Sequence, residues 1–393
     1  MYQTTAIAVV MLYIGNYLKR KIIFLDKFCI PAPVVGGLLF AIISCALFVS
    51  GTVEFQFDET LKNVFMVAFF TSVGFQANVK ILKSGGLSLV VYLICVVVLI
   101  IGQNFLAIAL SKFVGVSALV GLCTGSISMV GGHGTSGAFG PVLELLGLDG
   151  ATTLCTAAAT FGLVGGSLMG GPIGRRLILK KNLLETAVKE DDTVLVEEEK
   201  KHERSPKMYA TAIYQIAFAM GLGTVVSELL TKTGMTFPIY IGAMIVAAVM
   251  RNYSEFGGKF KVSVGEIGDV GNISLSLFLG IAMITLKLWQ LASLALPLII
   301  LLFGQTVLMF LFAYFVVFNV LGRDYDAAIL SAGTCGFGMG ATPNAMANMH
   351  VLTEKFVPSV KAYLLVPIVG SMFADFLNSL AITLFINFLW LGG

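Results

Sequence analysis

Long apolar stretches, separated by short polar segments, run through almost the whole chain. A helix needs about 20 apolar residues to cross a hydrocarbon core about 30 Å thick. The pattern predicts ten membrane-spanning helices, at 4–18, 33–49, 62–79, 88–111, 152–174, 209–230, 238–250, 270–287, 291–320 and 360–391. The alternating pattern of a transmembrane β-strand is absent, so we expect an all-α polytopic membrane protein in the lipid bilayer.

Two glycine-rich segments interrupt this pattern. They are 125–140, "GSISMVGGHGTSGAFG", and 331–349, "SAGTCGFGMGATPNAMANM". The first is interrupted by six glycines and the second by glycines and Pro343, so neither is expected to form one regular helix, yet both are too apolar to be loops in water. Broken backbone at membrane depth is tolerated where protein or a water-filled cavity covers it. We therefore expect two re-entrant hairpins, at about 116–146 and 327–350.

The composition agrees with a membrane protein. The 393 residues are 57% hydrophobic and 12% charged, which is about half the charge of a typical soluble domain. A formal net charge of +3 gives no reason to expect a nucleic-acid partner. The six cysteines are scattered without a C-x-x-C pair, so neither a disulfide framework nor a zinc site is indicated, and no cofactor is expected.

The distribution of Lys and Arg predicts the orientation of the chain. With the amino terminus outside, the predicted outer loops keep only Lys62, Lys112, Lys232 and Lys287, and the other basic residues fall on the inner side. The positive-inside rule requires this asymmetry. The long polar stretch at 182–207 is then a cytoplasmic linker of mixed charge, and both termini lie outside.

The two parts of the chain on either side of this linker resemble each other at an offset near 205 residues. Matching positions include Pro33 with Pro238, Gly37 with Gly242, Gln103 with Gln305, and Ser167 with Ser371. The predicted repeats are 1–181 and 208–393, each with five spans and one hairpin. Because five is odd, the second repeat must be inverted relative to the first, which is typical of secondary transporters.

Candidate binding groups gather at the two hairpins. Glycine lets the backbone approach a ligand closely, half-helix N-termini attract anions, and free carbonyls coordinate cations. The candidates are Ser126, Ser128, Gly132, His133, Gly134, Thr135 and Ser136 in the first hairpin and Cys335, Gly336, Gly338, Gly340, Thr342, Pro343 and Asn344 in the second. This oxygen-rich set suits an alkali cation better than Zn²⁺, which prefers Cys and His.

Asp375 is the clearest carboxylate inside a predicted span, and Asn378 follows it by one helical turn. A charge at mid-membrane is costly, so such a residue is expected to be functional. Asp375 is predicted to line a cation or substrate path, with Thr135 and Thr342 as further Na⁺ candidates; the alternative is a packed structural acid. His133 is either a hydrogen-bonded scaffold or a lining group.

The motifs "GGHGTSGAFG", "YDAAILSAGTCGFGMGATPNAMANM" and "VPIVGSM", among others, closely resemble the bacterial sodium/glutamate symporter family over essentially the whole chain. The resemblance implies Na⁺-coupled uptake of L-glutamate across the bacterial inner membrane, two inverted five-helix domains, and a homodimer that works by an elevator-like movement. It places the pore loops at 131–135 and 335–343. Ser136 and Asn344 stand where the resemblance leads us to expect Gly and Thr, and both keep a polar side chain.

Two other readings remain open. One is a transporter of another small dicarboxylate or amino acid, coupled to Na⁺ or to protons through Asp375 or His133. The other is a membrane-embedded enzyme, which would need a nucleophile–base pair or a metal cluster. Since only His133 and Asp375 are candidates for such a pair, the sequence favours a transporter and predicts no enzyme activity.

Overall fold

The computed structural model of the protein describes residues 1–28, 30–80, 86–185, 205–232, 238–257, 260–290 and 295–391, and every regular element in these ranges is a helix. Before the linker, the helices are α1 Tyr2–Lys21, α2 Ile23–Lys27, α3 Ala32–Val49, α4 Thr60–Gln76, α6 Gly86–Val114, α7 Ala118–Thr124, α8 Gly132–Leu145, α9 Ala151–Lys180 and the 3₁₀ turn η1 Leu183–Glu185. After it come α10 Pro206–Thr231, α11 Ile239–Glu255, α12 Val264–Ile284, α13 Ala295–Leu311, the π-helix η4 Phe312–Val317, α14 Phe318–Val320, α15 Tyr325–Gly338, α16 Thr342–Lys355, α17 Val360–Pro367, the π-helix η5 Ile368–Ala374 and α18 Asp375–Leu391.

Several helices begin where the sequence carries a capping residue. The Ser117 side chain accepts a hydrogen bond from the Leu119 amide at the start of α7, and Asp324 accepts one from the Ala327 amide at the start of α15. These side chains satisfy backbone donors that have no partner inside the helix. Ser117 lies at the start of the first predicted hairpin and Asp324 just before the second, so a local sequence signal marks where α7 and α15 start.

In the described residues each of the ten predicted spans overlaps one helix or, at 291–320 and 360–391, three consecutive helical elements, and an all-helical chain with several apolar spans is confirmed. Within the described residues, six helices are long and apolar enough to cross a membrane, or seven if the bent pair α17 and α18 counts as one span. The helices α4 and α11 are only 17 residues long. The predicted limits were too short at α9, which continues from 174 to Lys180.

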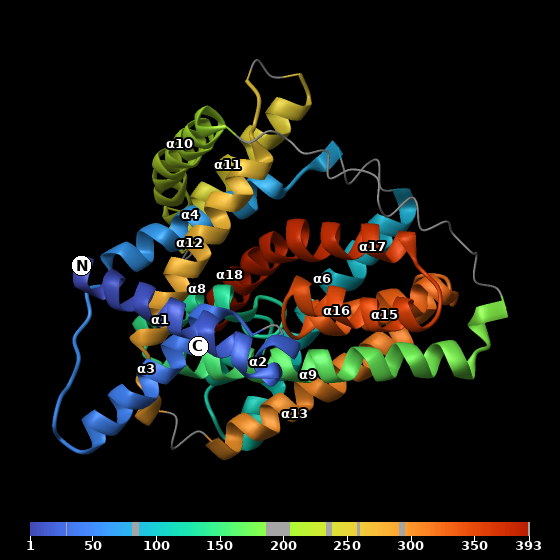
Figure 1. The fold of residues 1–393 in the computed structure, drawn as a ribbon, viewed down its shortest axis with the longest axis horizontal. Coiled ribbons are helices and arrows are strands. Elements are labelled where there is room, and N and C mark those ends of the chain that lie inside the picture. The colour runs from blue at the N-terminus through green and yellow to red at the C-terminus, as the bar shows by residue number, and fades with distance from the viewer. Residues whose placement is uncertain are drawn as a thin grey trace.

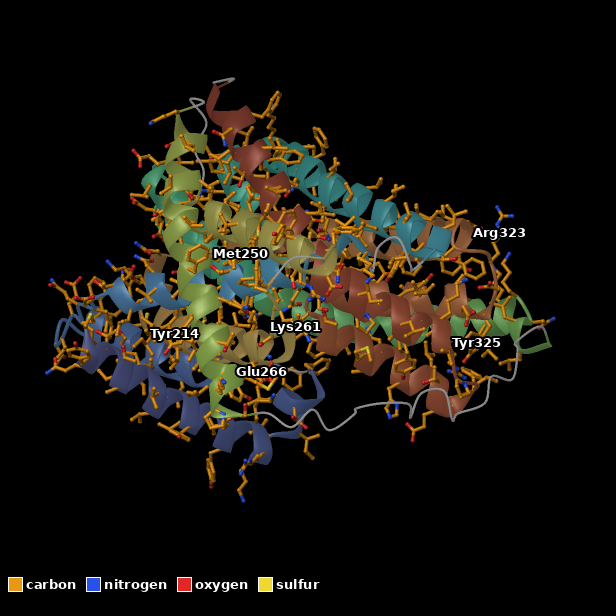
Figure 2. The ribbon with its side chains drawn as sticks, turned by 90° about the horizontal axis from the view of Figure 1, so that it is seen from above. Tyr214, Met250, Lys261, Glu266, Arg323 and Tyr325 are labelled. Atoms are coloured by element: carbon orange, nitrogen blue, oxygen red, sulfur yellow. The ribbon has the colours of Figure 1, made fainter. Side chains whose placement is uncertain are left out.

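The helices pack as two groups, and each group combines elements from before and after the linker. The first helix group contains α1, α3, α4, α10, α11 and α12, and the second helix group contains α6 to α9, α13 and α15 to α18. In Figure 1, α10, α11 and α4 lie at the upper left, while α15, α16 and α17 lie to the right. Figure 2 shows the same division, with Tyr214 and Met250 well separated from Arg323 and Tyr325.

The last predicted span, 360–391, is bent rather than straight. The axes of its two helical parts, Val360–Ser371 and Asp375–Leu389, differ by 41°. Pro367 ends α17 and a π-helical segment follows it, and both features are recognised causes of sharp kinks. The bend places Asp375 at the first position of α18. Most of the predicted cytoplasmic linker, 186–204, lies outside the described residues.

Candidate functional site

The first glycine-rich segment is folded as two helices joined by an irregular connection. The helix α7 ends at Thr124, and α8 begins at Gly132. Gly132 has φ of +55°, in the left-handed region that only glycine adopts easily. A β-carbon at this position would stand 2.8 Å from the backbone oxygen of Gly340. Position 132 therefore requires glycine for two reasons: the backbone is left-handed, and a side chain would overlap the Gly340 oxygen.

The second glycine-rich segment has the same plan. The helix α15 ends at Gly338, and α16 begins at Thr342 with Pro343 in its first turn. A β-carbon on Gly336 would stand 2.3 Å from the backbone nitrogen of Ala345, so the two helices pack with their backbones in contact. The contact of Gly340 with Gly132 brings the two interruptions together.

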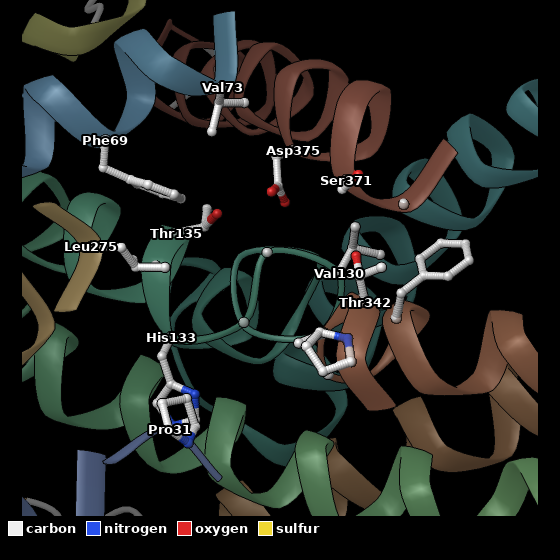
Figure 3. A pocket seen from close by; sticks show the side chains of 18 of the residues that line it. Pro31, Phe69, Val73, Val130, His133, Thr135, Leu275, Thr342, Ser371 and Asp375 are labelled. Atoms are coloured by element: carbon white, nitrogen blue, oxygen red, sulfur yellow. The ribbon is translucent and has the colours of Figure 1, made fainter. Parts of the chain in front are cut away.

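A cavity of about 230 Å³ lies where these interruptions meet, between the two helix groups. We call it the central cavity (Figure 3). The first helix group contributes α4 and α12 to its wall, and the second contributes the starts of α8 and α16 together with η5 and α18. Eight predicted site residues line it: Gly132, His133, Gly134, Thr135, Gly340, Thr342, Pro343 and Asp375.

The lining of the central cavity contains one carboxylate, that of Asp375, and neither Lys nor Arg. The hydroxyls of Thr135 and Thr342 face the same space (Figure 3), and Thr135 is 2% exposed. Within the described part of the chain, Asp375 makes no ion pair and neither hydroxyl donates to a protein acceptor. An unpaired carboxylate with free hydroxyl oxygens is a donor set that suits a hard cation.

The same cavity also has anion-binding character. The helices α8 and α16 both begin at its wall, so their positive dipole ends lie beside it. At α16, Pro343 has no N–H and the Asn344 amide donates to the Ala341 carbonyl, which leaves the Thr342 amide. Each helix is 14 residues long. A carboxylate ligand can therefore be held here without a guanidinium or an ammonium group.

His133 lies at the edge of the central cavity and links α8 to α9. Its Nε2 lies 3.0 Å from the hydroxyl oxygen of Thr160, and that hydroxyl donates its only proton to the Thr156 carbonyl at 2.9 Å. The Thr160 oxygen therefore accepts, and Nε2 of His133 must carry the proton. The structure thus gives His133 a scaffold contact as well as a place in the lining.

Three other candidates of the first hairpin, Ser126, Ser128 and Ser136, and Asn378 of α18 do not line the cavity and instead support the irregular connection. Asn378 on α18 donates to the backbone carbonyl of Ser126 at 3.0 Å. Asn104 on α6 both donates to the Ser126 hydroxyl and accepts from the Ser126 amide, at 2.8 and 2.9 Å. The hydroxyls of Ser128 and Ser136 lie 2.9 and 3.2 Å from the Cys155 carbonyl. These contacts hold the non-helical backbone in place.

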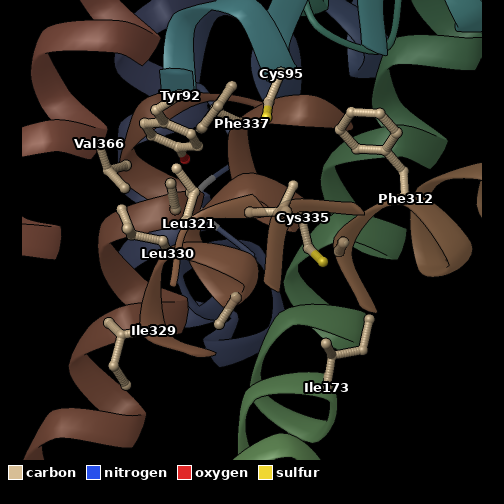
Figure 4. Packing of buried hydrophobic residues seen from close by; sticks show 14 of the residues in the cluster. Tyr92, Cys95, Ile173, Phe312, Leu321, Ile329, Leu330, Cys335, Phe337 and Val366 are labelled. Atoms are coloured by element: carbon tan, nitrogen blue, oxygen red, sulfur yellow. The ribbon is translucent and has the colours of Figure 1, made fainter. Parts of the chain in front are cut away.

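The remaining candidates lie outside the cavity lining and pack around the second interruption. Cys335 is fully buried in an apolar cluster with Ile173 and Phe312 (Figure 4), and its thiol lies 3.3 Å from the Ser331 carbonyl. The Asn344 amide donates to the Leu163 carbonyl and the Ser167 hydroxyl of α9, at 3.1 and 2.6 Å. Gly336 and Gly338 also lie outside the cavity lining.

Three polar lining residues were missed by the sequence reasoning: Gln76 on α4, Asn272 on α12 and Ser371 on η5. Ser371 could have been found from the sequence, because it occupies the position in the second repeat that matches Ser167 in the first. Gln76 and Asn272 had none, since nothing in the sequence shows that α4 and α12 pack against the two interruptions.

Comparison with known proteins gives a consistent result. Residues 1–358 match the family model described as sodium/glutamate symporter. The sodium/glutamate symporter of Escherichia coli K12 is 40% identical over 387 residues, covering 98% of this chain and 96% of that protein. The sodium/glutamate symporter of Haemophilus influenzae is 38% identical over 383 residues, covering 96% and 95%.

Among solved structures, a sodium proton antiporter from Methanocaldococcus jannaschii aligns with 99% of this chain and 98% of its own, at 13% identity and a TM-score of 0.36.

Proposed function

The chain belongs to the sodium/glutamate symporter family, so it is a transporter and not an enzyme, and we propose that it carries L-glutamate and Na⁺ together through the central cavity. The family and the apolar helices make it a multi-pass inner-membrane protein. The observation that carries the proposal is the pairing, in one cavity, of an unpaired carboxylate with two helix N-termini.

The two ligands use different parts of the cavity lining. Na⁺ binds at Asp375 with the hydroxyl oxygens of Thr135 and Thr342, which have no protein acceptor among the described residues. The carboxylates of glutamate lie at the N-termini of α8 and α16, where backbone N–H groups and the helix dipoles stabilise negative charge. Because no Lys or Arg lines the cavity, the bound cation also offsets the charge of the substrate, and this couples the two binding events.

Transport occurs by alternating access, in which the second helix group moves against the first in an elevator-like way. The cavity lies between the groups, and both interruptions belong to the second group. Inverted repeats at 1–181 and 208–393, each with a re-entrant hairpin, account for the matching break in each repeat. In support, Pro33 and Pro238 stand at the starts of the corresponding helices α3 and α11.

In the proposed orientation, the position of the central cavity along α4 supports an inward-facing state. With both termini outside and the linker cytoplasmic, α4 runs inward and ends at Gln76. The central cavity contacts Phe69, Val73 and Gln76, the last turns of that helix, and the exposed Asn272 on α12. The cavity therefore lies nearer the cytoplasmic end of α4, whereas its lining residues on α12, Asn272, Leu275 and Leu279, lie around the middle of that helix. The proposal also includes assembly of the protein as a homodimer, and this part is based on the family resemblance alone.

The test is uptake of labelled L-glutamate into proteoliposomes under imposed ion gradients. We expect accumulation with an inward Na⁺ gradient and none with K⁺ in its place. Uptake that runs equally well on a proton gradient without Na⁺ would show proton coupling instead. A labelled panel that includes L-aspartate and dicarboxylates without an amino group would reveal another substrate.

A further inference from the structure

A second cavity, of about 300 Å³, lies at the other end of the helices that line the central one. We propose that it binds an amino-acid zwitterion, with the carboxylate at its buried floor and the ammonium group at its charged rim, as an entry site for the transported substrate. Its lining is almost entirely polar: Glu59, Lys62, Glu144, Asp149, Gly150, Thr152, Thr153, Thr285, Leu286, Lys287 and Gln290.

Four helices connect the second cavity to the central one, and one of them is α9, with Thr152 in the second cavity and Leu163 in the central one. The helix α4 has Lys62 in the second cavity and Phe69 in the central one, and α8 has Glu144 in the second and Thr135 in the central one. At 1.5 Å per residue these positions are about 10 and 13 Å apart along the two helices. The helix α12 lines the central cavity and ends at the second one.

The space between the two cavities is closed by tight packing. Phe278 on α12 is fully buried, and a β-carbon on Gly137 of α8 would stand 2.8 Å from its ring. On the other side of α8, a β-carbon on Gly140 would stand 2.5 Å from the Cα of Thr152. A ligand in the second cavity is therefore separated from the central cavity in this state, and reaches it only when α8 and α12 move apart.

The floor of the second cavity suits a carboxylate. Lys62 is 3% exposed and forms an ion pair with Glu59. The Thr152 hydroxyl oxygen is buried without a protein partner, and Thr153, which is 2% exposed, lines the same surface. The 30-residue helix α9 begins here at Ala151, so its positive dipole end adds to the ammonium group and the hydroxyl donors.

The rim carries exposed charges of both signs. Glu144 accepts a hydrogen bond from the Thr152 amide with one oxygen, at 3.0 Å, and its second oxygen is left for a ligand. Asp149 and Lys287 make no ion pair within the described residues, although both line the cavity. Separated unpaired charges of opposite sign fit a ligand that itself carries an ammonium group and carboxylates, which is the chemistry of an amino acid.

The identification of this amino acid as glutamate, and of this side as the outer one, rests on the proposed function. The test uses the full-length protein with Asp149→Asn and Lys287→Gln, alone and combined. Both residues are exposed, so folding should be preserved. Lys112→Gln and Lys232→Gln are matched controls, because they remove a positive charge on the same predicted side but outside the cavity.

We expect the combined variant to raise the KM for glutamate uptake by about tenfold, the effect of one or two lost charged contacts, with the rate at saturating glutamate unchanged. Calorimetry of the purified protein with L-glutamate at saturating Na⁺ should show a second, weaker binding event that the combined variant lacks. Raising the ionic strength with choline chloride should slow uptake at low glutamate in the wild type but not in the combined variant.

Variants that match the Lys112 and Lys232 controls in KM and in calorimetry would overturn the second site while leaving the proposed function intact. Wild-type protein that takes up no glutamate on a Na⁺ gradient would instead overturn the proposed function. In that case the calorimetric comparison, repeated with other amino acids, still decides whether the second cavity binds a zwitterion.

Discussion

Gln305 on α13 donates a hydrogen bond from its side-chain amide to the backbone carbonyl of Gln103 on α6, at 2.8 Å. Gln103 in turn donates from its own side chain to the Gly338 carbonyl, also at 2.8 Å. Gly338 ends α15, where carbonyls have no partner inside the helix. The two glutamines, which occupy matching positions in the proposed repeats, therefore form a chain of contacts that supports the second interruption.

The change Gln103→Leu tests this support. It leaves the Gly338 carbonyl buried without its donor, a loss of about 1–3 kcal/mol for an unsatisfied group. We expect lower thermal stability in detergent and slower uptake. Gln3→Leu, at an exposed position of α1, is the control and should change neither. Equal melting temperatures for the two variants would remove the role given to Gln103.

Gly132→Ala tests the contact between the two interruptions. A left-handed backbone costs a residue with a side chain about 1–2 kcal/mol, and the new methyl group would also overlap the Gly340 oxygen. We expect loss of most uptake activity together with reduced stability. The control Gly221→Ala, on α10 with open space around it, should be neutral or slightly stabilising. Full activity of Gly132→Ala would contradict the close approach.

The sequence predicted the two interruptions because Gly and Pro act locally, through backbone conformation and missing N–H donors. The repeat and the intramembrane charge also made Thr135, Thr342 and Asp375 candidates, and all three line the central cavity; their role as a binding site stays a prediction. It did not separate lining residues from supporting ones. Ser126 could have faced a ligand, but it contacts Asn104 instead. This contact depends on how α6 packs against the connection between α7 and α8, and no local sequence pattern encodes that packing.

The predicted repeats likewise could not show which helices share a core. Apolar periodicity defines each span, but a membrane helix is apolar on most faces, so the pattern does not identify its neighbours. The close packing of α4 on α12, from opposite sides of the linker, follows instead from steric fit. Gly271 on α12 shows this, because a β-carbon there would stand 2.0 Å from the Ser72 hydroxyl on α4.

Thr342→Val and Thr135→Val test the Na⁺ ligands. Valine nearly matches threonine in shape but lacks the hydroxyl oxygen, so folding should survive while Na⁺ affinity falls. We expect the Na⁺ concentration for half-maximal glutamate uptake to rise by roughly tenfold, with a smaller fall in maximal rate. Thr224→Val, at an exposed position of α10, is the control. Unchanged Na⁺ dependence in both test variants would place the ion elsewhere.

Asp375→Asn removes the one carboxylate of the central cavity lining while keeping its size. We expect Na⁺-driven uptake to fall by at least tenfold at low Na⁺, because an amide oxygen binds a cation less strongly than a carboxylate. Asp375→Glu should retain part of the activity. Glu228→Gln, exposed on α10, is the charge-matched control. If Asp375→Asn keeps the Na⁺ dependence of the wild type, Asp375 does not bind the ion and its role is structural.

The proposed orientation is tested by labelling single cysteines, after replacement of the native ones. Thr193→Cys in the linker should react with a membrane-impermeant thiol reagent only after the cells are permeabilised, because the positive-inside rule places it in the cytoplasm. Lys232→Cys should react in intact cells. Labelling of Thr193→Cys from outside would reverse the topology and, with it, the inward-facing assignment.

The composition of the two helix groups also has a consequence for biogenesis. Because each group takes helices from both sides of the linker, neither can complete its core until the chain beyond residue 205 has entered the membrane. The early helices α1, α3 and α4 must wait in the bilayer with their future contact faces covered by lipid or by an insertion factor. Fragments ending before the linker should therefore be degraded when made alone, and should persist when the remaining fragment is made in the same cell.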